Sequence, residues 1–91
     1  MTNNLELRPY EACVNITWNG QNGDLPDPVS FDATDAEIKG WAGEAIRGGG
    51  IPGIRADPNV DLDGFVVDRF TVTADTPYNR LFLRPKTPFG Q

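Results

Sequence analysis

The segment between Asp32 and Ile54 carries the clearest structural signal in the chain, because its periodicity, its start and its end all agree. Its apolar residues recur at spacings of three and four, which places them on one stripe of a helix, with charged residues outside the stripe. The stripe consists of Ile38, Trp41, Ala42, Ala45 and Ile46. A helix of this kind has to cover an apolar surface, and we expect Trp41 to make its largest buried contribution.

The ends of this helix are also marked. Thr34 or Asp35 can cap the first free N–H groups, and Glu37 stands three residues after Thr34, as a capping box requires. Three consecutive glycines, Gly48 to Gly50, followed closely by Pro52, predict that the helix ends near Arg47 or Gly48.

Residues 10–18 alternate between apolar and polar side chains, which predicts a half-buried strand. Its apolar face consists of Ala12, Val14, Ile16 and Trp18. The dipeptides Asn19-Gly20 and Asn22-Gly23 then predict a hairpin with a rather long tip. Because Pro26 and Pro28 restrict pairing, we expect Val29 to Asp32 to be the segment that returns along the first strand.

After the helix, residues 54–64 are rich in Pro, Asn and Asp and predict a loop. Residues 64–74 are dense in β-branched and aromatic side chains and predict a third strand. Residues 75–79 predict a turn, and Arg80 to Arg84 a last strand with Leu81 and Leu83 facing inward. The first and last strands are plausible central neighbours, which would make them parallel.

This order of elements indicates an α+β domain, in which one helix crosses one face of a mixed four-stranded sheet. A chain of 91 residues is long enough for one such domain and too short for two. We therefore expect a flexible N-terminus over residues 1–9, the folded domain over residues 10–84, and an extended C-terminal tail over residues 85–91.

Charge and composition weigh against several classes of function. The formal net charge of −5 disfavours nucleic acid and anionic membranes as partners. The chain has no apolar run near the roughly 20 residues that span a bilayer, and its start lacks the apolar core of a signal peptide. A single cysteine, Cys13, fits a reducing compartment. We expect a soluble, cytoplasmic monomer.

The sequence offers little for catalysis, and we expect no enzyme, cofactor or metal. It has no histidine, and Cys13 is a candidate nucleophile only if it lies exposed beside positive charge. The spacing Asn59-x-Asp61-x-Asp63-Gly64 matches the first half of a calcium loop, but Phe70 stands where the bidentate carboxylate belongs. A solvated turn whose Asn and Asp cap their own backbone is the favoured interpretation.

The stretch VSFDATDAEIKGWAGEAIRGGGIPGI, from Val29 to Ile54, resembles the second strand, helix and Gly-Ile-Pro turn of the ubiquitin family. The last strand, Leu81-Phe82-Leu83-Arg84, is similar as well. The resemblance implies a β-grasp fold. The chain departs from the family at its end, where the single Gly90, followed by Gln91, replaces a pair of glycines.

The resemblance implies a bacterial ubiquitin-like protein modifier. A processing protease would remove Gln91, and activating and conjugating enzymes would then attach Gly90 to target proteins. Activation requires a residue without a Cβ next to the reacting carbonyl, which Gly90 satisfies.

The alternative is a non-covalent docking module with an inert tail. In the family, the exposed face of the sheet binds partners, and the matching candidates here are Phe82 and Arg84, with Val66 or Val67 beside them. Phe82 could also pack under the C-terminal tail or against a neighbouring strand, since lone exposed aromatic residues are common.

Overall fold

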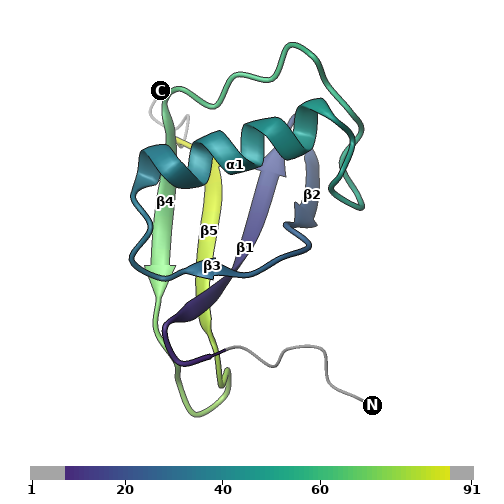
Figure 1. Ribbon diagram of the computed structural model, residues 1–91. Helices are drawn as coiled ribbons and strands as arrows, with labels where there is room; N and C mark the ends of the chain where they lie inside the picture. Colours follow the sequence, from purple (N-terminus) through teal and green to yellow (C-terminus); the bar gives the residue numbers. More distant parts are fainter. Residues whose placement is uncertain (1–7, 87–91) are drawn as a thin grey trace.

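A computed structural model describes residues 8–86, which form one helix and five strands (Figure 1). In chain order these are β1 (Glu11–Trp18), β2 (Gln21–Asp24), β3 (Val29–Ser30), α1 (Asp35–Arg47), β4 (Phe65–Phe70) and β5 (Asn79–Pro85). Figure 1 shows α1 lying across one side of the sheet, with the long segment after it returning over the top to β4.

The sheet is mixed and follows the order β2-β1-β5-β4. β2 and the two-residue β3 pair with different parts of β1, both antiparallel, so together they flank one side of that strand. β1 and β5 are parallel in the centre, as expected from the sequence, and β4 is antiparallel to β5. The result is an α+β domain with a β-grasp-like topology.

The core lies between α1 and the sheet, and strand alternation supplies most of it. Ala12, Val14 and Ile16 of β1, with Leu81 and Leu83 of β5, are buried on the side that faces the helix. The remaining buried apolar residues are Ala33, Ile38, Ala42, Ile46, Ile51, Ile54 and Leu62. The inward positions predicted for β1 and β5 are therefore confirmed.

The helix ends are confirmed too. The Thr34 hydroxyl accepts from the Glu37 N–H (3.1 Å), and the Glu37 carboxylate accepts from the Thr34 N–H (2.9 Å), which completes the capping box. At the other end Gly48 is the C-cap, and Gly49 adopts a positive φ of 74°.

The expected role of Trp41 is wrong. Its side chain is 43% exposed, whereas Ile38, Ala42, Gly43 and Ile46 are the buried positions of α1. The buried stripe is turned toward Gly43, because the loop after the helix brings Leu62 against that side. Trp18 is the tryptophan that packs against the core, next to Phe65 and with its Nε1 donating to Asp57 (2.9 Å).

The first hairpin is tighter than expected. Its tip is only Asn19-Gly20, both with positive φ (53° and 77°), as a two-residue turn requires. Asn22-Gly23 lies inside β2, and Val29–Ser30 is all that remains of the expected return segment Val29 to Asp32. A Cβ at Gly23 would lie 2.3 Å from the Pro52 carbonyl oxygen, so this glycine permits close packing and does not form a turn.

The third strand is shorter than predicted and ends at Phe70 instead of continuing to residue 74. The reason is a side chain that replaces the partner strand. The Val72 N–H donates to the Asn79 side-chain oxygen (3.2 Å), and the Thr73 N–H donates to the Thr76 carbonyl (2.9 Å), which closes a turn.

Arg69 ties β4 to the start of the helix. Its guanidinium donates to the carbonyl oxygens of Phe31 and Ala33, each at 2.9 Å, and to the Asp35 carboxylate at 2.6 Å. This arginine therefore fixes the segment between β3 and α1 against the edge strand.

Candidate functional site

The face of the sheet opposite the helix carries a side-chain layer that the core does not use. Strand register decides its membership, because directly paired residues lie on the same face. Its members are Glu11, Cys13, Asn15 and Thr17 from β1, Asn22 and Asp24 from β2, Val66, Asp68 and Phe70 from β4, and Arg80, Phe82 and Arg84 from β5. We call this layer the open face.

Three of the four predicted docking residues lie on the open face. Val66 pairs with Arg84, and Phe82 lies between Asn15 and Asp68 on the two neighbouring strands. Val67 does not belong there, because it pairs with the buried Leu83 and packs against the core. Of the alternatives Val66 and Val67, the register therefore places Val66 on the open face and Val67 on the side that packs against the core.

An aromatic and cationic cluster lies on the open face where β4 ends and β5 begins. The rings of Phe70 and Phe82 meet edge to face, with their centroids 5.4 Å apart. The Arg80 guanidinium carbon lies 5.3 Å from the centroid of Phe70 and 5.6 Å from that of Phe82. Sequence reasoning named Phe82 but missed Phe70 and Arg80. Alternation along β5 puts Arg80 on the same face as Phe82, but only the pairing of β4 with β5 shows that Phe70 lies there too.

Phe82 is thus not a lone exposed aromatic residue. It packs against β4, as the alternative interpretation anticipated, and it is half-buried. Arg84 beside it is committed to an ion pair, since its Nε donates to the Asp68 carboxylate at 2.6 Å. The cluster of Phe70, Arg80 and Phe82 therefore presents an apolar surface with one cation beside two rings.

A shallow hollow of about 300 Å³ adjoins this cluster. It is lined by Cys13, Asn15, Asp24, Tyr78, Arg80 and Phe82. Burial, and to a smaller extent the nearby Asp24 carboxylate, raise the pKa of the Cys13 thiol. A raised pKa keeps the thiol protonated, which is the opposite of what a nucleophile needs.

Asparagines fix the other side of the open face. The Asn15 amide donates to the side chains of Asn22 (3.0 Å) and Asp24 (2.8 Å), and its oxygen accepts from Asn22 (2.9 Å). This ladder holds the Asp24 carboxylate in place at the rim of the hollow. These polar groups form hydrogen bonds with one another, so they hold this side of the open face in a fixed arrangement and leave few groups free to bind a partner.

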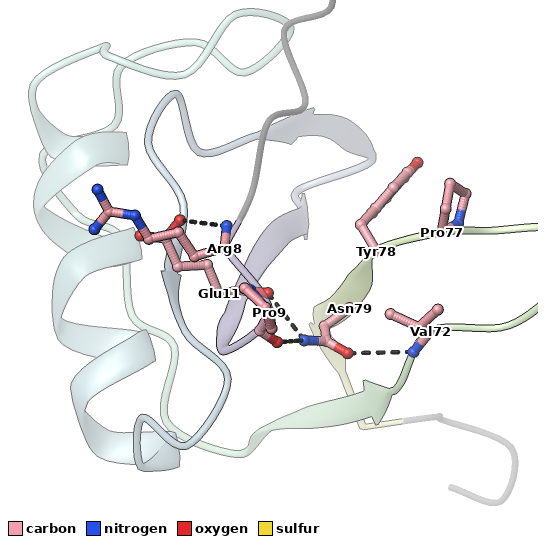
Figure 2. Close-up of a pocket in the computed structure, with 7 residues that line it drawn as sticks. All are labelled: Arg8, Pro9, Glu11, Val72, Pro77, Tyr78 and Asn79. Carbon is pink, nitrogen blue, oxygen red and sulfur yellow. Dashed lines mark hydrogen bonds between the residues drawn. The ribbon is translucent and has the colours of Figure 1, made fainter.

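A second hollow, of about 260 Å³, lies at the start of β1 (Figure 2). Figure 2 shows Asn79 between two segments, donating to the carbonyls of Pro9 (2.9 Å) and Glu11 (3.0 Å) and accepting from the Val72 N–H (3.2 Å). Asn79 is only 7% exposed, and its amide is fully engaged with backbone. The Asn79 side chain therefore joins the start of β1 to the segment after β4, and its amide is not free to bind a ligand. Tyr78, the residue before β5, lines both hollows.

A third hollow, of about 400 Å³, lies on the helix side of the molecule. Its lining is mostly apolar and consists of Leu25, Pro26, Asp27, Val29, Trp41, Ala45 and Gly50. Trp41, which was expected to be buried in the core, therefore borders a surface groove next to the segment that links β2 and β3.

The segment with half of a calcium-loop pattern is a capped turn, as favoured from the sequence. The Asp61 carboxylate accepts from the Asp63 N–H (3.0 Å), and the Asp57 carboxylate accepts from the Asn59 N–H (2.9 Å). Across residues 8–86, no group of three or more His, Cys, Asp or Glu residues is arranged to hold a metal ion.

Gly90 and Gln91, the predicted conjugation and processing residues, lie outside the described residues, as do residues 1–7. The last described residue, Lys86, is exposed just beyond β5. Within the described part of the chain, no helix is long and apolar enough to cross a membrane.

Comparison of the chain with protein-family models, with curated proteins and with solved structures finds no match. The case for a function therefore depends on the geometry of the open face.

Proposed function

We propose that this protein is a ubiquitin-like β-grasp module that binds other proteins through the open face of its sheet. The observation that carries the proposal is the cluster of Phe70, Arg80 and Phe82, where two rings 5.4 Å apart hold an arginine. Aromatic and arginine side chains contribute most of the binding energy in many protein interfaces. Phe70 is 43% exposed and lies outside the described core, so its ring is available to a partner.

The test compares two aromatic residues on opposite sides of the molecule. Phe82→Ala in the tagged full chain is expected to lose specific partners in a pull-down from host lysate, identified by mass spectrometry. Trp41→Ala is the control, because it removes an aromatic side chain that is more exposed than the half-buried Phe82 and lies on the helix side. Both variants should show a cooperative unfolding transition. If Phe82→Ala retains the partners and Trp41→Ala loses them, the binding surface lies on the helix side and not on the open face.

A covalent modifier is the second candidate function. What favours it is the β-grasp-like topology, in which β5 occupies the centre of the sheet and the chain leaves it at an exposed Lys86, toward Gly90 and Gln91. Activating and conjugating enzymes and a processing protease would then be the partners, and the open face would be the surface that they recognise.

The modifier candidate is tested by intact mass. Incubation of the full chain with host lysate and ATP should remove Gln91 and produce higher-mass adducts, and Gly90→Ala should abolish the adducts. Persistence of Gln91, together with identical products from Gly90→Ala, would exclude conjugation while leaving non-covalent docking in place.

A further inference from the structure

The described ion pairs leave one arginine of the open face without a carboxylate. Arg69 pairs with Asp35 and Arg84 with Asp68, each at 2.6 Å, whereas Arg80 belongs to neither pair. Within residues 8–86, the Arg80 Nε is also buried without a hydrogen-bond partner. A ligand cannot reach this buried atom, so a partner carboxylate entering the hollow would pair with the terminal N–H groups of the same guanidinium, whose charge no described ion pair neutralises.

The position of this guanidinium is fixed by its surroundings. The guanidinium carbon lies 5.3 Å from the centroid of the Phe70 ring and 5.6 Å from that of Phe82. On the other side, Arg80 pairs with the half-buried Cys13 of β1. A planar guanidinium held by aromatic rings loses little side-chain entropy when a carboxylate binds. The hollow of about 300 Å³ beside it leaves room for a side chain to approach.

Tyr78 lines two hollows, one on the open face beside Phe82 and the other at the start of β1 beside Val72 and Pro77. An extended peptide places successive side chains on opposite sides, so it can fill a hollow while a neighbouring residue covers the rings. We infer that Arg80 is the anchor for a single Asp or Glu side chain of an extended partner segment, with an adjacent apolar residue on Phe82.

This inference rests on the proposed docking function and names its ligand. The Asp24 carboxylate at the rim of the same hollow repels further negative charge, as does the net charge of −5. The site therefore selects one carboxylate within an apolar context and not a run of acidic residues. Tyr78 and Phe82 supply that apolar context.

The experiment uses short peptides displayed on phage, selected against the full chain and then synthesised with both termini blocked, so that only side-chain carboxylates remain. Selected peptides should contain Asp or Glu next to an apolar residue. Arg80→Gln should weaken their binding, measured by calorimetry, about ten-fold or more, because a charge-assisted hydrogen-bonded pair is lost. Arg80→Lys should restore part of the affinity, and Asp24→Asn should increase it.

Two controls separate this inference from the docking proposal. Arg55→Gln removes the same charge from an exposed loop position outside the open face and should leave affinity unchanged. A peptide with its acid replaced by the amide should bind wild type and Arg80→Gln equally, as a double-mutant cycle requires. If peptide binding depends on Phe82 but is equally strong to Arg80→Gln and to wild type, the carboxylate anchor is overturned and docking on the open face is not. Peptides indifferent to both residues would overturn docking on this face as well.

Discussion

At the scale of single residues, Gly23 shows how closely β2 approaches the turn after the helix. A Cβ there would lie 2.3 Å from the Pro52 oxygen and 2.7 Å from Ile51 Cγ2, and one at Gly53 would lie 2.5 Å from the Asn22 oxygen. Two glycines on opposite sides of this contact therefore allow backbone to meet backbone.

Gly23→Ala is expected to lower the free energy of unfolding by about 1–3 kcal/mol, because the added methyl forces the Ile51-Pro52 turn away from β2. Urea denaturation followed by tryptophan fluorescence measures the change. Gly40→Ala is the control, since no atom lies within 4 Å of its Cβ position in the helix. That variant should raise stability by about 0.5–1 kcal/mol. Equal effects of the two substitutions would contradict the close contact.

Cys13 should react slowly with alkylating agents at neutral pH. Burial and the Asp24 carboxylate both disfavour the thiolate, so the pKa of Cys13 is raised and less of the reactive form is present. Asp24→Asn removes the negative neighbour, which lowers this pKa and should move the midpoint of the alkylation-rate profile to lower pH. Burial remains in that variant, so the midpoint should stay above that of a short cysteine peptide. A profile that Asp24→Asn leaves in place would remove Asp24 as a cause.

At the scale of elements, the edge strand β4 holds the start of the helix through one side chain. Arg69 donates to two carbonyls and one carboxylate of the segment from Phe31 to Asp35. Arg69→Gln is expected to cost about 1–3 kcal/mol of unfolding free energy, since charge-assisted hydrogen bonds are lost together.

Arg84→Gln is the comparison for this prediction, because Arg84 also pairs with a carboxylate at 2.6 Å but lies on the surface. Exposed pairs contribute about 0–1 kcal/mol, so its loss should change the urea midpoint little. Hydrogen exchange at the first turn of α1 should rise in Arg69→Gln and not in Arg84→Gln. Similar exchange in both variants would show that Arg69 does not secure the helix.

Elements whose signals are local were predictable from the sequence. The capping box at Thr34, the stop at Gly48 and the alternation of β1 each depend on residues a few positions apart. The wrong predictions concern residues whose surroundings come from segments distant in the sequence. Trp41 is exposed because Leu62 covers the other side of the helix, and Val66 could not be separated from Val67 without the pairing of β4 with β5.

The candidate site was only partly predictable for the same reason. Alternation within one strand placed Phe82 and Arg84 opposite Leu81 and Leu83. The same alternation places Arg80 on that face, whereas Phe70 joins them only through the register of β4 with β5, two strands that a loop separates. A cluster assembled across strands has no signal in any single stretch of residues.

At the scale of the whole molecule, the fold depends on a strand from late in the chain. β5 lies between β1 and β4, and it supplies Leu81 and Leu83 to the core. A chain ending at Tyr78 is therefore expected to show no cooperative unfolding transition, because β1 and β4 then have no common partner. A chain ending at Lys86 retains every described core residue and should unfold cooperatively near the wild-type midpoint. Circular dichroism during heating checks both, and a cooperative transition in the shorter chain would refute the dependence.

The parallel pairing of β1 with β5 also has a consequence during protein synthesis. The residues that complete the centre of the sheet are translated long after the hairpin and the helix, so a nascent chain emerging from the ribosome exposes the apolar sides of both elements until β5 follows. Molecular chaperones that bind nascent chains would therefore have the most time to bind these apolar surfaces before β5 is translated. The domain would then close in a single late step.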